Sequence, residues 1–184
     1  MSELPSWYPG TENKPAPMPL LRVQAFVNTY DVEDETDLLA DLETASAWLT
    51  DAGLLAEGAN LGEADLAFAR EVREGIRSLL AGGDEVESLR RVAASHRARL
   101  TVAEDGTVGV EPARAGELGD GLFGLLLTIH GAQEDGSWSR LKVCANPDCR
   151  WAFFDRSRNQ QGNWCNMAVC GNRLKNRQHR AQRR

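Results

Sequence analysis

The amino-acid sequence has few of the side chains that enzymes use for chemistry near neutral pH. Its 184 residues include only three histidines, His96, His130 and His179, and none is spaced to pair with a nucleophile or a metal ligand. A glycine-rich phosphate loop, a Gly-x-Ser-x-Gly turn and a His-Glu-x-x-His motif are all absent. These absences predict a protein that is not an enzyme.

Long hydrophobic runs are also missing. A membrane-spanning helix needs about 18 or more apolar residues, and the longest apolar run, around residues 125–127, is interrupted by Gly124 and His130. Nothing near the N-terminus resembles a secretory signal. We therefore expect a cytoplasmic protein that does not enter a membrane and whose thiols are kept reduced.

Proline is scarce outside the first 19 residues, which hold five of the seven prolines. Proline removes a backbone donor and fixes its own backbone, so this segment has little capacity for a helix or a sheet. We predict a flexible arm over residues 1–19, with Trp7 and Tyr8 packed back on the body.

Cysteine is absent before residue 144, and the four cysteines form two pairs of identical spacing. Cys144 and Cys149 make the first Cys-x4-Cys pair, and Cys165 and Cys170 make the second after fifteen intervening residues. Four thiolates in two close pairs are the usual ligands of a closed, tetrahedral structural zinc site, which has no open position for catalysis. The pattern predicts one zinc ion, which would supply folding free energy that so short a segment lacks.

Other uses of four cysteines remain open. Two disulfides would need an oxidising compartment, and a redox-active pair is disfavoured because there is no Cys-x-x-Cys motif. Iron or an iron–sulfur cluster also accepts four thiolates, and the sequence does not distinguish either from zinc.

Charge is divided unevenly along the chain. The net charge is −6, but residues 139–184 hold eleven Lys or Arg and two acidic residues, a net +9, whereas residues 1–138 carry −15. After the last cysteine, four arginines recur at helical spacing: Arg173, Arg177, Arg180 and Arg184. A basic helix that starts at a metal site and extends from an acidic body is typical of nucleic-acid binding confined to one end.

Apolar residues recur at helical spacing through most of residues 20–136. The first two predicted helices cover residues 20–29 and 36–51. A third is opened by an Asn60–Glu63 capping box and ended by Gly82, and a fourth is capped by Asp84 and reaches Leu100. The fifth covers residues 118–129. The last is the most apolar and is expected at the centre of the core. Asn28 is expected either to bond to a neighbouring backbone or to line a ligand pocket.

Two hairpins complete the expected fold. Asp105-Gly106 between β-branched runs predicts one over residues 101–110, and extended segments flank the first cysteine pair. The predicted fold is mainly α: a helical N-terminal domain over residues 20–136 with a small β-hairpin, followed over residues 137–184 by a treble-clef-like four-cysteine zinc finger that ends in a basic helix.

The segment from Cys144 to Lys175 resembles the CGNR zinc finger, a family named for the sequence found here as Cys170-Gly171-Asn172-Arg173. Further matches are Phe154-Asp155, Ser157, Asn159, Trp164-Cys165 and Met167. In that family the finger follows an N-terminal ABATE domain, whose opening helix resembles residues 25–29. The family has basic residues before the Trp-Cys pair, where this chain has Gly162 and Asn163.

This resemblance implies a bacterial DNA-binding transcriptional regulator whose N-terminal domain senses a ligand or forms a homodimer. The residues expected to contact nucleic acid are Asn172, Arg173, Lys175, Arg177, Arg180, Arg183 and Arg184. An RNA-binding or ribosome-associated protein is one alternative, with unpaired bases stacked on Trp151, Phe153, Phe154 and Trp164. A protein-interaction module with a purely structural zinc is another.

Overall fold

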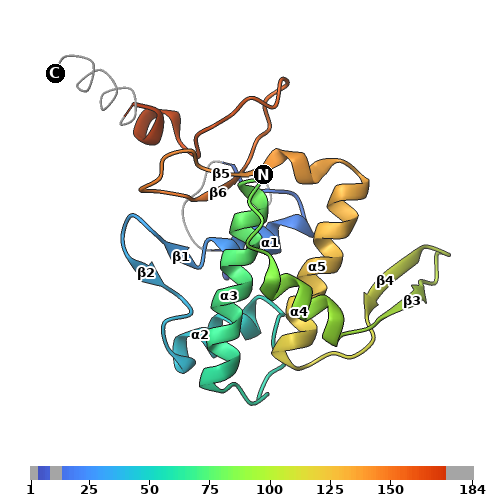
Figure 1. Cartoon of the computed structure of the whole chain (residues 1–184). Coiled ribbons are helices and arrows are strands. Elements are labelled where there is room, and N and C mark those ends of the chain that lie inside the picture. Colours follow the sequence, from blue (N-terminus) through green and yellow to red (C-terminus); the bar gives the residue numbers. More distant parts are fainter. Residues whose placement is uncertain (1–3, 9–13, 173–184) are drawn as a thin grey trace.

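The computed structural model of the chain describes residues 4–8 and 14–172, and within them the fold is mainly helical (Figure 1). The helices are α1 Leu20–Val27, α2 Leu42–Asp51, α3 Glu63–Leu80, α4 Glu87–Ser95 and α5 Leu118–Glu134, and the strands are β1 Tyr30–Asp31, β2 Thr36–Asp37, β3 Ala98–Val102, β4 Val108–Pro112, β5 Leu141–Val143 and β6 Ala152–Phe154. The strands pair as three antiparallel hairpins, β1–β2, β3–β4 and β5–β6. No helix in these two stretches is long and apolar enough to cross a membrane.

The centre of the core is α1, where seven of the eight residues are buried. Helices α3 and α5 and strand β6 all pack against it. The prediction that residues 118–129 form the centre was wrong, because α5 buries only part of its circumference. One side of α5 lines a cavity instead.

Two helices begin later than their apolar pattern predicted, because polar side chains mark the starts. Helix α2 begins at Leu42, where the Asp41 carboxylate accepts a hydrogen bond from the Thr44 backbone N–H at 2.9 Å. Residues 30–37 form the β1–β2 hairpin instead of a first helical turn. Helix α3 starts at Glu63, where the Asp65 carboxylate accepts from the Gly62 N–H at 3.0 Å, so Asn60 is not the cap.

The fourth helix is shorter than predicted, and the hairpin that follows it is longer. Helix α4 ends at Ser95 because the next residue, His96, is extended and its ring stacks on Phe123 with centroids 5.6 Å apart. Leu100, assigned to the helix from its spacing, lies in β3 opposite Val110 and is 73% exposed. Figure 1 shows that the β3–β4 hairpin extends away from the helices.

The described parts of the N-terminal segment make specific contacts with the body. Tyr8 is buried, and the Trp7 carbonyl accepts a hydrogen bond from the Trp48 indole N–H at 2.7 Å. Further on, the Lys14 carbonyl accepts from the Phe154 N–H at 2.9 Å, on the edge of β6. The predicted packing of Trp7 and Tyr8 on the body is therefore confirmed.

Strand β6 is joined to the helical body through both backbone polar groups of one residue, Ala152. The Asn28 side chain donates to the Ala152 carbonyl at 2.9 Å and accepts from the Ala152 N–H at 2.7 Å. Gln24, one turn earlier on α1, donates to the same carbonyl at 3.1 Å. Both amides are buried, and Leu141, Ala152 and Phe154 belong to the main core. The two expected domains therefore share one core.

A buried arginine forms the second link between body and finger. Arg77 of α3 has no exposed surface and donates to the Val27 carbonyl at the end of α1, at 2.7 Å, and to the Arg150 carbonyl at 3.1 Å. Burial lowers the pKa of Arg77, and the nearby Glu74 carboxylate opposes that shift. The guanidinium thus holds the backbone beside Cys149 against the end of α1.

We predict that Asn28→Ala lowers the free energy of unfolding by about 2–3 kcal/mol, because a buried Ala152 N–H loses its acceptor. Urea denaturation in zinc-containing buffer, followed by circular dichroism and tryptophan fluorescence, measures the change. The exposed Asn60 supplies the control, since Asn60→Ala should shift stability by no more than about 0.5 kcal/mol. Equal stabilities of the two variants would mean that the joint contributes nothing.

Candidate metal centre

The first cysteine pair lies in the turn of the β5–β6 hairpin. Cys144 follows β5 and its N–H donates to the Trp151 carbonyl at 2.9 Å, which continues the ladder beyond the strands. The buried Asn146 accepts the Cys149 N–H on its carbonyl at 3.0 Å and closes the turn. The extended segments predicted on either side of the first cysteine pair thus form a hairpin, and the metal-binding knuckle is its tip.

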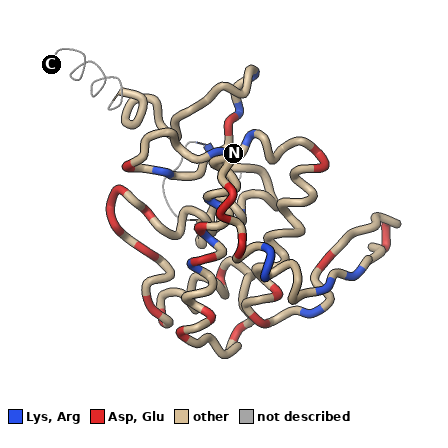
Figure 2. The backbone as a smooth tube through the Cα atoms, viewed as in Figure 1, with Lys and Arg blue, Asp and Glu red and all other residues tan. Residues whose placement is uncertain are grey.

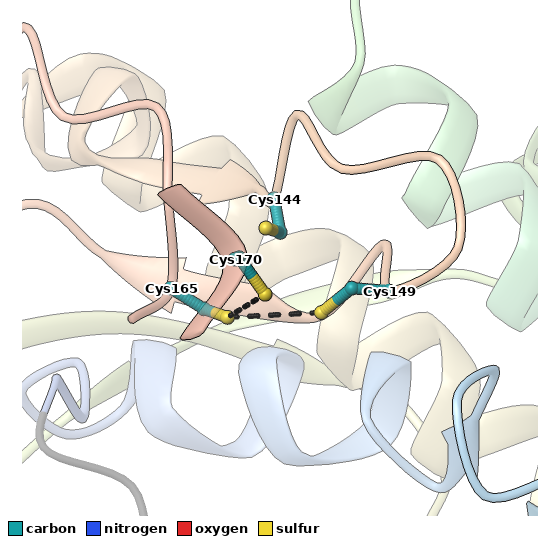
Figure 3. A group of neighbouring side chains, drawn as sticks. All are labelled: Cys144, Cys149, Cys165 and Cys170. Atoms are coloured by element: carbon teal, nitrogen blue, oxygen red, sulfur yellow. Dashed lines mark hydrogen bonds between the residues drawn. The ribbon is translucent and has the colours of Figure 1, made fainter. Parts of the chain in front are cut away.

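The second cysteine pair is positioned by a capped turn of helix. The Asn166 side chain accepts from the Ala168 N–H at 2.9 Å and opens a π-helical turn over Met167–Gly171. The Asn166 carbonyl accepts the Cys170 N–H at 2.9 Å. Cys165 therefore precedes the turn and Cys170 lies within it, so both sulfurs face the first pair (Figure 3).

The four sulfurs converge to the dimensions of a tetrahedral thiolate site. All four lie within 4.8 Å of one another, and the Cys149–Cys165 and Cys165–Cys170 distances are 3.7 Å (Figure 3). With Zn–S bonds of about 2.3 Å, the edge of a tetrahedron is about 3.8 Å. All four cysteines are free thiols, and a disulfide would need about 2.05 Å. The donor set and spacing fit zinc.

The four thiol groups of this cluster affect one another's pKa values. Hydrogen bonds from Cys149 and Cys165 lower the pKa of Cys144 to about 2. The hydrogen bond to Cys144 raises the pKa of Cys149 to about 12, and the pKa of Cys165 is raised further by Cys144 and Cys149. One thiolate thus opposes the formation of the next. Four thiolates this close require a bound positive charge, which a metal ion supplies.

Two tryptophans cover the cysteines, and a glycine allows the approach. Trp151 and Trp164 pack on the cysteine cluster. A side chain at Gly171 would place its Cβ 2.5 Å from the Met167 sulfur and 3.2 Å from the Trp164 ring. The neighbouring Phe153 and Phe154 are buried in the hairpin. Of the four aromatic residues suggested for base stacking, these two have almost no surface to offer.

The loop between the cysteine pairs is organised around the buried Asp155. Its carboxylate accepts from Lys142 Nζ at 2.9 Å, from the Ser157 N–H at 3.0 Å and from the Gly162 N–H at 2.7 Å. Burial opposes ionisation, but hydrogen bonds from Ser157, Lys142 and Gly162 outweigh it and lower the pKa of Asp155. A Cβ at Gly162 would lie 2.9 Å from the carboxyl carbon. Gly162 therefore closes the loop.

The expected nucleic-acid contacts fall mostly beyond the described residues. Arg173, Lys175, Arg177, Arg180, Arg183 and Arg184 all lie outside them. Asn172 is exposed, and its side chain donates to the Ala168 carbonyl at 3.1 Å, which continues the helical turn. Acidic residues are distributed over the helical body and its loops (Figure 2).

Asn28 does not line the body's cavity, contrary to one of its two expected roles. Its side-chain amide donates to the Ala152 carbonyl and accepts from the Ala152 N–H, which is the other expected role, a bond to backbone. Arg22 and Asp120 do line the cavity, and the sequence analysis missed both. Arg22 carried a usable signal, because it is the one charged residue in the apolar segment 20–27.

Comparison with known families covers nearly the whole chain. Residues 22–134 match the ABATE family, described as "Putative stress-induced transcription regulator". Residues 140–183 match the CGNR zinc finger. No curated protein matches the chain.

We predict that Asp155→Asn destabilises the protein by about 1–3 kcal/mol, because bonds to a charged acceptor become bonds to a neutral one. A lowered pKa means that the carboxylate's contribution is complete above the unfolded pKa of about 3.9 and is lost only below it. The loss should therefore be constant from pH 5.5 to 8 in urea denaturation. Asp34→Asn, at an exposed loop position, is the control, and a loss that varied across this range would refute the assignment.

Proposed function

Because the chain belongs to the ABATE family and carries a C-terminal CGNR zinc finger, we propose that it is a DNA-binding transcriptional regulator of the bacterial cytoplasm. The zinc finger meets the DNA, and the helical body receives the signal or mediates dimerisation. The observation that carries the proposal is the fusion of a basic, metal-centred end to an acidic body.

The four ligands of the zinc ion are Cys144, Cys149, Cys165 and Cys170. Sulfur spacing, the absence of disulfides and mutual repulsion of thiolates support this assignment. A tetrahedron completed by four thiolates gives the zinc a structural role. Its effect is to fix the turn from which the C-terminal basic segment starts.

Charge favours nucleic acid as the partner of that segment. Residues 139–184 carry +9 against −15 on the remainder, so an approaching duplex is attracted to one end and repelled by the other. Phosphate contacts would come from Lys175, Arg177, Arg180, Arg183 and Arg184. Asn172 ends the turn that holds Cys170, and Arg173 follows it in the sequence, so these two are the candidates to read bases.

RNA is the weaker alternative. Recognition of unpaired bases relies on exposed aromatic faces, and Phe153 and Phe154 are buried in the β5–β6 hairpin. Trp151 and Trp164 are committed to covering the cysteines. The finger therefore presents basic rather than aromatic surface.

Dimerisation, if the body performs it, would use the β3–β4 hairpin. Leu100, Val102, Val108 and Val110 lie on one face as two cross-strand pairs, and all four are exposed. A two-stranded hairpin is marginally stable alone in water, so covering this face would stabilise it. A second copy of the chain offers an identical apolar face. Light scattering of the full chain measures its molar mass and so tests for a dimer. The molar mass of a monomer would exclude dimerisation through the hairpin.

We predict one zinc ion per chain and its loss in Cys170→Ser, because three thiolates no longer close the site. Metal analysis of the purified full chain measures this. Cys170→His replaces the sulfur ligand by a nitrogen ligand and should retain zinc. Zinc retained in Cys170→His but lost in Cys170→Ser would show that the loss comes from the missing ligand and not from general damage to folding. Full zinc occupancy in Cys170→Ser would overturn the ligand set.

We predict that the double variant Arg177→Ala/Arg180→Ala weakens binding to all duplexes alike. If about five phosphates are neutralised, log affinity falls with log salt at a slope of about −4.5, and removing two contacts flattens it by about two units. Arg90→Ala/Arg91→Ala changes the same charge on the exposed face of α4 and should leave the slope unaltered. Equal slopes for both double variants would exclude the tail from the interface.

We expect the role of Arg173 to differ from that of the other arginines, because it follows Cys170 by only three residues in the sequence. Arg173→Ala should change preference among sequences in a panel of DNA sites, measured at one salt concentration. An even loss across the panel would leave the tail as an electrostatic anchor without base reading.

A further inference from the structure

A cavity of about 750 Å³ lies beside α1 and α5 in the helical body. Its walls are the segment 17–20, the turn 53–56, strand β4 and one side of α5. This volume is in the range of small-molecule sites. Figure 1 shows α1, α5 and the β3–β4 hairpin that frame this part of the body.

Two glycines of α5 keep the cavity open without a packing reason. A glycine inside a helix costs about 1 kcal/mol relative to alanine. Gly121 is required because a Cβ there would lie 2.0 Å from the Leu54 carbonyl oxygen. At Gly131 a Cβ would meet nothing within 4 Å, and at Gly124 it would meet only Pro112 at 3.7 Å. Packing does not require glycine at these two positions. The absence of a side chain there leaves space in the cavity.

Arg22 places a half-buried positive charge at this cavity. It is the one charged residue of α1, and its Nε is buried with no hydrogen-bond partner. Within the described residues its guanidinium also forms no ion pair. A buried N–H without an acceptor is costly, so an anion that accepts from Arg22 Nε would be stabilised at this point.

Asp120 faces the same cavity from α5 and is 8% exposed. In the part of the chain that the structure describes, no hydrogen bond or ion pair reaches its carboxylate, from Arg22 or from any other group. The other ionic groups of the lining differ: Arg99 and Glu111 pair with each other at 2.6 Å, and Arg114 and Asp135 are exposed. Charge selection therefore falls to Arg22 and Asp120.

We propose that this cavity binds an amphipathic organic anion. The anionic group of the ligand pairs with Arg22, its apolar portion lies along α5 over Gly124 and Gly131, and a hydrogen-bond donor on it reaches Asp120. Leu20, Leu54 and Leu125 supply the apolar contacts. The inference rests on the sensing role proposed for the body and names the ligand class that it takes. Its test involves no DNA, so the two proposals fail separately.

Two fluorescent probes of nearly the same shape separate the charge from the cavity. Anilinonaphthalene sulfonate carries an anionic group and an N–H donor, and N-phenyl-1-naphthylamine lacks the sulfonate. With the full-length, zinc-loaded chain, Arg22→Met should weaken sulfonate binding about tenfold, in line with a charge-assisted bond, and change the neutral probe by less than about twofold. Asp120→Asn should tighten sulfonate binding a few-fold, because it removes a like charge.

A steric variant and two controls complete the test. Gly131→Leu fills open space on a helix that accepts leucine readily, and it should abolish binding of both probes. Arg90→Met, on the exposed side of α4, should leave both unchanged. Leu100→Ser/Val102→Ser reports any probe bound to the apolar hairpin. Sulfonate binding that survives both Arg22→Met and Gly131→Leu, or that disappears only in the hairpin variant, overturns the proposal.

Discussion

The rest of the structure depends on one contact, in which the side-chain amides of Gln24 and Asn28 bind the backbone N–H and carbonyl of Ala152. A side-chain amide offers a donor and an acceptor at the spacing of a peptide bond, so Asn28 replaces the strand neighbour that β6 lacks at this point. Because these groups are buried, separating the elements would leave them unsatisfied at about 1–3 kcal/mol each. Arg77 adds a second attachment at the Arg150 carbonyl, one residue after Cys149. The body thus determines where the metal centre lies.

The amount of this architecture that sequence could predict follows from how local each signal is. Cys144–Cys149 and Cys165–Cys170 repeat a spacing with chemical meaning, and the helical stripes and Asp105-Gly106 are also short-range patterns. Asn28 and Ala152 are 124 residues apart, and nothing near either one indicates the other. The prediction that Leu100 is helical was wrong although its local signal was clear. Leu100 continues the helical spacing, but His96 stacks on Phe123 and the helix ends before Leu100 is reached. Local patterns therefore predicted elements, and tertiary contacts decided their ends and their joints.

The finger is also less autonomous than a zinc-stabilised peptide. Its own apolar cover consists of Trp151 and Trp164, whereas Leu141 and Phe154 lie in the core of the body. On the outer edge of β6, the Lys14 carbonyl accepts from Phe154, so the N-terminal segment also completes the sheet. Zinc organises the tip, and the body organises the base. The position of the turn Met167–Gly171, which the basic segment follows in the sequence, therefore depends on both.

Helix α1 connects the cavity to the metal centre because its two sides serve different sites. Arg22 lines the cavity, while Gln24 and Asn28 hold Ala152. The segment 17–19 also lines the cavity, and it continues back to Lys14 beside β6. A ligand changes DNA binding only if it prefers one of two arrangements of the intervening contacts. The Asn28–Ala152 joint is one of these intervening contacts. A small displacement of α1 by a bound anion would therefore act on the finger through this joint first.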